Sequence, residues 1–165
     1  NQGDNMIRLL KIALAASVSV FCLFYAIQNI VNHSQAMWFV QTMVSMQGHE
    51  AYPDSIIPAV RSPIIVGIML WIIILLELTA GYLAGKGAID MFLARNADPD
   101  TFNASKTNAL AGALVGVLIW FGIFGAFGGA LFQMWQVDAG LNALRDAGMF
   151  SIQLGVVWMI LKRND

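Results

Sequence analysis

The sequence has few charged residues and a single cysteine. Charged side chains make up 12% of its 165 residues and apolar side chains 58%, whereas ordinary globular domains hold roughly 25% and 45–50%. One cysteine excludes an intramolecular disulfide framework and a zinc site built from cysteines. Cys22 lies inside an apolar run, so we interpret it as a small buried side chain. The composition therefore excludes an ordinary soluble domain and indicates a membrane protein.

The sequence also lacks the charge pattern and the motifs of several function classes. The net charge is −1 and the isoelectric point is about 6.1, with no basic stripe to neutralise phosphates, so we expect no nucleic-acid partner. No complete catalytic, metal or nucleotide motif is present. We therefore predict that the protein is not an enzyme, that it has no cofactor and that membrane lipids surround it.

Long apolar runs predict an all-α fold, a four-span transmembrane helical bundle in which residues 1–165 form one integral membrane domain. Each run approaches the roughly 20 residues that a helix needs to cross a bilayer. The last run is short, so we expect its helix to begin earlier, within 141–144, or to tilt little. The predicted spans are residues 7–31, 63–93, 109–134 and 146–162.

The distribution of basic residues predicts the orientation of the bundle. Segments on the side of the termini hold seven Lys and Arg residues, and those on the other side hold only Arg61 and Arg145. Because basic residues concentrate in cytoplasmic segments, both termini are predicted to face the cytoplasm. The inner loop 86–106 mixes both signs of charge, which is typical of a solvated surface but also fits a docking surface.

The first outer loop is predicted to contain a short interfacial helix over residues 36–46. Met37 and Met43 fall on one side of it at helical spacing, as expected for an amphipathic segment in the membrane interface. Trp38 and, further along, Tyr52 are aromatic residues typical of that interface.

Small residues are frequent in the second and third spans and predict close helix packing. Gly81 and Gly85 form a small-xxx-small pair in the second span. In the third span, one face carries Gly112 and Gly116, and at 100° per residue a different face carries Gly122, Gly125 and Gly129. Two such faces fit packing within the bundle, and they also fit docking of another protein's helix on one side.

Glu77 interrupts the apolar run of the second span, where a carboxylate costs about 2.5–3.5 kcal/mol even on lenient insertion scales. No cation is predicted at its depth, so we expect a neutral acid that makes a hydrogen bond between helices. Proton or ion handling, and pairing with a cation of another subunit, are the alternatives. The polar residues expected near its depth are Ser17, Ser19, Trp120 and Gln153.

Two histidines flank the predicted interfacial helix. His33 and His49, together with Met37, Met43 and Met46, offer the imidazole and thioether groups that suit Cu(I). Haem ligation by the two histidines is a second alternative. The methionines also serve as apolar anchors of the helix, and we favour ordinary surface histidines and no metal site.

Several segments together resemble a known family. They are the stretch 97–106, the glycine-rich span with Trp120 that follows it, and the segment 132–136. They resemble a bacterial family of predicted small integral membrane proteins, found mainly in proteobacteria and described as a domain of unknown function. The resemblance covers nearly the whole chain from Met6. It implies four spans in the bacterial inner membrane, and it implies no activity.

The function that the sequence favours is a non-catalytic accessory subunit of a larger inner-membrane complex of the respiratory or transport type. The small size, the glycine faces and the lack of catalytic motifs support this interpretation, which implies a hetero-oligomeric partner. The alternative is a small homo-oligomeric transporter or channel that uses Glu77 for proton or ion handling. A membrane enzyme is the least favoured, because nucleophile–base pairs and metal clusters are missing.

Overall fold

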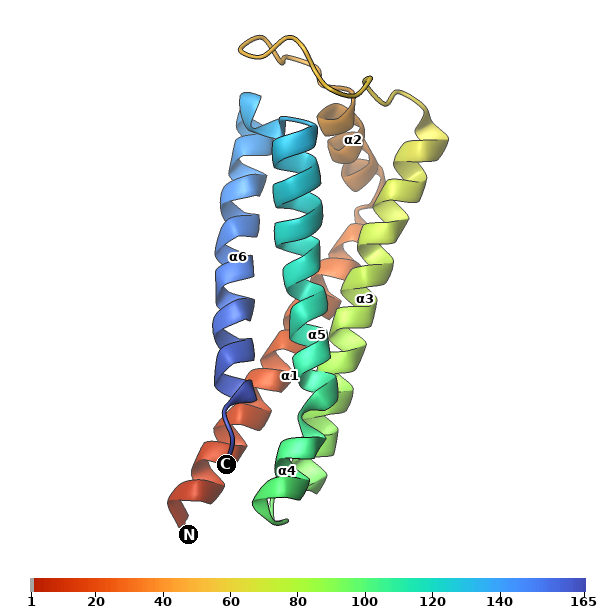
Figure 1. Cartoon of the computed structure of the whole chain (residues 1–165). Helices are drawn as coiled ribbons and strands as arrows, with labels where there is room; N and C mark the ends of the chain where they lie inside the picture. Colours follow the sequence, from red (N-terminus) through yellow and green to blue (C-terminus); the bar gives the residue numbers. More distant parts are fainter. Residues whose placement is uncertain (1) are drawn as a thin grey trace.

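The computed structural model describes the backbone of residues 2–165 and the side chains of residues 5–165. In this range the fold is all-helical and contains four helical segments long and apolar enough to cross a membrane (Figure 1). This confirms the predicted fold class. The elements are α1 (Gln2–Val31), α2 (His33–Val44), α3 (Pro63–Leu93), α4 (Pro99–Ser105), α5 (Thr107–Val117), η1 (Leu118–Leu131), η2 (Met134–Gln136) and α6 (Asp138–Lys162).

All four predicted spans correspond to helices, but three of these helices begin earlier than predicted. Helix α1 ends at Val31 as predicted and begins at Gln2 instead of residue 7. Helix α3 begins and ends where the second span was predicted. The third segment runs from Pro99 to Leu131, because Asp98 starts a helix well before the predicted residue 109. Its Oδ1 accepts a hydrogen bond from the Thr101 backbone N–H at 3.0 Å, which caps that helix. Helix α6 begins at Asp138, before the predicted range 141–144, because the polar residues that precede the short apolar run are also helical.

Both termini lie at one end of the bundle, which we call the terminal end (Figure 1). The opposite end, called the loop end, carries the long connection between α2 and α3. Helix α1 packs chiefly against α3, α3 also packs against α5, and α6 packs against α5 and η1. Helix α1 is tilted relative to the other helices (Figure 1).

Helix α2 follows α1 after a break at Asn32, whose backbone leaves the helical region at φ −102° and ψ 38°. The Asn32 side chain donates to the Gln28 backbone carbonyl at 3.0 Å. Helix α2 packs along the loop-end half of α3, where Val44 clusters with Val66. The short helix predicted between the first two spans is thus present as His33–Val44, and it lies against the bundle.

Element η1 is a π-helical run of 14 residues, whereas π-helices occur mostly as single-turn bulges. At its end the Phe132 backbone N–H donates to the carbonyl of Phe127, five residues earlier, at 2.8 Å. The run changes the angle between successive side chains. Faces deduced from α-helical periodicity therefore do not hold beyond Val117.

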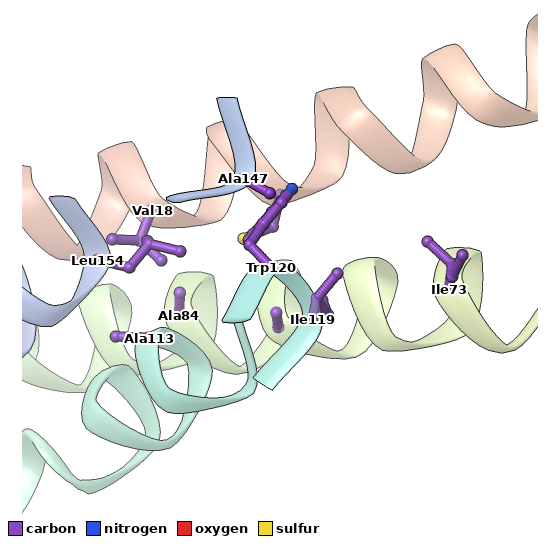
Figure 2. Packing of buried hydrophobic residues seen from close by; sticks show 10 residues of the cluster. Val18, Ile73, Ala84, Ala113, Ile119, Trp120, Ala147 and Leu154 are labelled. Carbon is purple, nitrogen blue, oxygen red and sulfur yellow. The ribbon is translucent and has the colours of Figure 1, made fainter. Parts of the chain in front are cut away.

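The main core cluster joins all four segments (Figure 2). Trp120 reaches from η1 towards α1 beside Ala147 of α6, and only 3% of it is exposed. Ala84 of α3 and Ala113 of α5 are completely buried nearby, which allows these two helices to approach closely. The core is made of large aromatic side chains on one side and small residues on the other.

Candidate functional site

Glu77 lies near the middle of the 31-residue helix α3 and is only 1% exposed. Its Oε2 accepts a hydrogen bond from Asn29 Nδ2 of α1 at 3.0 Å. Among the described residues no cation pairs with Glu77. The carboxyl group therefore joins two helices by a hydrogen bond at bilayer depth, as expected for a structural role, but the donor is a residue that sequence reasoning did not identify.

None of the four polar residues expected near Glu77 forms a hydrogen bond with it. Ser17 donates to the Ala13 carbonyl of its own helix at 2.8 Å, and Ser19 donates to the Gly81 carbonyl of α3 at 2.7 Å. Trp120 belongs to the main core, and Gln153 is exposed on α6. The expected depths were wrong because the register between α1 and α3 sets Ser19 beside Gly81 and Asn29 beside Glu77, so the end of α1 lies beside the middle of α3.

Four of the predicted packing glycines in the second and third spans make close contacts with neighbouring helices. A β-carbon on Gly112 would lie 2.5 Å from the Ala84 backbone nitrogen, and one on Gly81 would lie 2.6 Å from Leu23. On Gly85 it would meet the Ser19 hydroxyl at 2.7 Å. On Gly116 it would meet Leu154 of α6 at 2.8 Å. These four glycines pack inside the chain.

The second predicted glycine face does not form, because η1 is π-helical. A β-carbon on Gly122 would meet nothing within 4 Å, and on Gly125 its nearest contacts would be within η1 itself. Gly129 alone contacts another span, with Leu144 of α6 at 3.1 Å. Gly122, Gly125 and Gly129 therefore do not share one packing face.

An apolar groove of about 310 Å³ lies between α2, α3 and η1 near the loop end. Every residue that lines it is apolar, among them Phe39, Met69, Ile72, Phe124 and Phe127. Such a surface accepts hydrocarbon but offers no polar group to orient a ligand or to react with it. The groove could not be predicted, since it depends on the path of α2 and on the π-helical run.

The terminal end contains a buried charged cluster, which we call the terminal clasp. Lys11 Nζ donates to Asp165 Oδ2 at 2.7 Å and to the Arg163 carbonyl at 2.8 Å. Lys106 Nζ donates to the same carboxylate oxygen and carbonyl, and to Asn103 Oδ1 at 2.6 Å. Lys106 is 2% exposed and Lys11 is 5% exposed. The clasp ties the last residues to α1 and to the junction of α4 and α5.

The clasp determines the ionisation of Asp165. Burial alone raises the pKa of the Asp165 carboxyl, but hydrogen bonds from Lys106 and Lys11 outweigh that effect, and the net pKa is lowered. Close by, Arg8 donates to the Arg95 and Ala97 carbonyls at 3.0 and 2.7 Å. Part of the mixed-charge loop is therefore structural, whereas the exposed pair Lys86–Asp90 is solvated.

The residues predicted to lie at the membrane interface differ in how exposed they are. Trp38 is 65% exposed and Tyr52 is 62% exposed, and the Tyr52 ring contacts Trp135 at a centroid distance of 5.3 Å. Met43 is 4% exposed, and Met37 packs against the buried residues beneath α2. The helix therefore buries its methionines and exposes its tryptophan.

The two histidines do not assemble a metal site with acidic or thiol groups. Among the side chains of residues 5–165 no group of three or more His, Cys, Asp or Glu could hold a metal ion. The His33 ring lies 6.0 Å from Trp71 of α3. Burial lowers the pKa of His49, so at neutral pH its imidazole is uncharged.

Comparison with known proteins identifies the family of the chain. No curated protein matches it, and no solved structure matches it. A family model described as "Predicted small integral membrane protein" (DUF2165) matches residues 7–164. That range includes the Glu77–Asn29 pair, the glycine contacts and all of the terminal clasp except Asp165. This integral membrane protein therefore belongs to the DUF2165 family.

Proposed function

We propose that the protein is a non-catalytic accessory subunit that packs against a helix of a larger complex in the bacterial inner membrane. The observation that carries this proposal is the lipid-facing side of α6. Only 17% of the residues in the most apolar stretch of α6 are buried, against 28% to 39% in the other three spans. Helix α6 is therefore the span with the most surface left for a partner.

The exposed side of α6 carries small residues that serve no packing purpose within the chain. A β-carbon on Gly148 or Gly155 would meet nothing within 4 Å. These two residues are seven positions apart and share a face with Ile152. Glycine in a helix costs roughly 1 kcal/mol relative to alanine, and close approach by another helix is the usual compensation in membranes.

A polar side chain is exposed on a different face of α6, about 140–160° around the helix from Gly148 and Gly155, beside Leu14 and Phe21 of α1. Gln153 is exposed on α6 and makes no hydrogen bond within the described part of the chain. An amide at bilayer depth is stabilised by a hydrogen bond to a neighbouring helix. Gln153, however, lies outside the contact face formed by Gly148 and Gly155 and is not assigned to the partner helix.

The orientation belongs to the same proposal. The terminal end holds Arg8, Lys11, Lys106 and the basic residues at the ends of α3 and α6, whereas Arg61 and Arg145 lie towards the loop end. By the positive-inside rule the terminal end faces the cytoplasm. The partner surface of α6 then crosses the bilayer from the cytoplasmic side at Lys162.

The alternative, a homo-oligomeric transporter that uses Glu77, has less support. Glu77 is enclosed between α1 and α3 and bonded to Asn29, and it does not line the apolar groove. A transport path through Glu77 would require the two helices to separate. No specific observation favours such an opening.

The test is purification of the full chain from its native membranes in a mild detergent, followed by mass spectrometry of the intact assembly. We expect a larger hetero-complex with a fixed stoichiometry. Gly155→Leu blocks the proposed face and should lose the partner. Leu75→Phe, which changes the exposed side of α3, is the matched control and should keep it. Recovery of the wild type alone, or as a homo-oligomer, would contradict the proposal.

A further inference from the structure

Towards the loop end, α1 and α6 expose polar residues at a depth where α3 is still apolar. The hydrogen bond between Asn29 and Glu77 places the end of α1 beside the middle of α3. The contact between the His33 and Trp71 rings continues this alignment into α2. The polar residues around the break at Asn32 therefore lie at the depth of the apolar stretch of α3.

Helix α6 carries polar residues at the same depth. The Phe150 ring contacts Tyr25 of α1 at a centroid distance of 5.3 Å, so these two residues are level. Residues three or four apart in a helix are neighbours on one face. Gln28 therefore lies one turn beyond Tyr25, and Asp146 lies one turn beyond Phe150.

One more turn outward, Asn32 follows Gln28 and Asn142 follows Asp146. All four side chains are exposed, and we call them the polar notch. The Asn32 amide bonds only within its own helix, to the carbonyl and side chain of Gln28. Asp146 forms no ion pair with the side chains of residues 5–165. The polar notch thus faces the surroundings of the bundle and lacks partners in other helices.

The apolar lengths of the helices differ accordingly. Between Lys11 and Gln28, α1 offers 16 residues, about 24 Å of helix. Between Asp146 and Lys162, α6 offers 15 residues, about 23 Å. Helix α3 continues for 23 residues from Pro63 to Gly85, about 35 Å. The hydrocarbon layer is roughly 30 Å thick.

The surface of α3 shows that the bilayer does not simply end at the level of the polar notch. Beyond Glu77 towards the loop end, α3 exposes Leu75, Trp71 and Ile68, with exposed fractions of 56%, 45% and 56%. These side chains require hydrocarbon around them. A flat bilayer of one thickness cannot cover them and leave the polar notch in water.

We propose that the membrane leaflet at the loop end is locally thinned and hydrated beside α1 and α6, where water and lipid headgroups reach the polar notch. Membranes accommodate short apolar lengths and intramembrane polar groups by thinning and by water defects. On the α3 side the leaflet keeps its full thickness. The protein therefore creates a step in one leaflet, with headgroups lowered along one side of the bundle.

Cysteines introduced one at a time test this arrangement, because the natural thiol of Cys22 is completely buried. The protein without an introduced cysteine serves as the unlabelled control. Full-length Gln28→Cys and Asn142→Cys are placed in phosphatidylcholine vesicles and treated with a hydrophilic maleimide that does not cross membranes. The matched controls are Leu75→Cys and Ile68→Cys on α3. Labelling is measured by intact-protein mass spectrometry on protein oriented with its loop end outward.

We expect rapid labelling of Gln28→Cys and Asn142→Cys and protection of both α3 variants. The contrast should persist when long-chain lipids replace short-chain lipids. Two notch positions are used so that a folding defect in one variant leaves the other informative. Equal labelling of all four positions would mean that the loop end simply protrudes, and protection of all four would mean an unthinned leaflet. Either result overturns the proposal.

Discussion

Asn29 of α1 donates a hydrogen bond to Glu77 of α3 across 3.0 Å, and this bond joins the end of α1 to the middle of α3. Replacing Asn29 by Leu leaves the buried carboxyl group without its partner. We expect this to lower the free energy of unfolding by about 1–3 kcal/mol. The measurement is unfolding of the detergent-solubilised protein by titration with a denaturing detergent.

Glu77→Gln should be tolerated much better, since an amide oxygen can accept the same hydrogen bond. We expect a change within about 1 kcal/mol, the size of an ordinary hydrogen bond. The double variant Asn29→Leu with Glu77→Leu should recover much of the lost stability, because both polar groups are then removed. If Glu77→Gln were as damaging as Asn29→Leu, the structural role of the carboxyl group would be refuted.

Glycine substitutions should separate internal packing from exposed surface. In Gly112→Leu the side chain would collide with the α3 backbone at Ala80 and Ala84, so the folded protein should be lost from the membrane fraction. Gly148→Leu points into open space and should leave the isolated chain folded. Folded yield is measured by fluorescence size-exclusion chromatography. Equal loss in both variants would disprove the assignment of these two surfaces.

Acidification should weaken the terminal clasp. The folded pKa of Asp165 is lower than its ordinary value, so its stabilising contribution is complete above the unfolded pKa of about 3.9. It is lost as the pH falls through the lower folded pKa. Asp165→Asn should cost about 1.5–3 kcal/mol at neutral pH, the range for hydrogen bonds to charged groups. It should also flatten the acidic limb of a stability–pH curve, and an unchanged limb would contradict this account.

Trp120 should be the most sensitive tryptophan. It is 3% exposed in the main core, and its replacement by alanine should cost about 3–5 kcal/mol. Trp38→Ala is the matched control, since Trp38 is 65% exposed. Thermal unfolding of both variants should show a large decrease for Trp120→Ala only.

Hydropathy was sufficient to predict the four spans, because length and apolar content decide whether a helix crosses a bilayer. It could not predict the partner of Glu77. The register between α1 and α3 depends on tertiary packing, and it places Asn29, near the end of α1, beside Glu77 in the middle of α3. A residue's position along its own helix is therefore a poor guide to its depth relative to another helix.

The glycine pattern illustrates a second limit. Gly112 and Gly116 lie in regular α-helix, where 100° per residue places them on faces that contact neighbouring spans. Gly122 and Gly125 lie in η1, where the π-helical run changes the periodicity. The terminal clasp was missed for a different reason, since Lys106 and Asp165 are far apart in sequence and only the fold brings them together.

Site-specific photo-crosslinking in native membranes shows whether α6 presents a docking face to a larger complex. The photoreactive residue replaces Ile152, which is 69% exposed on α6, or Leu75, which is 56% exposed on α3. We expect one discrete adduct to a different, larger membrane protein from position 152 and only lipid adducts from position 75. Lipid adducts alone from both positions, or adducts between copies of this chain, would contradict the claim.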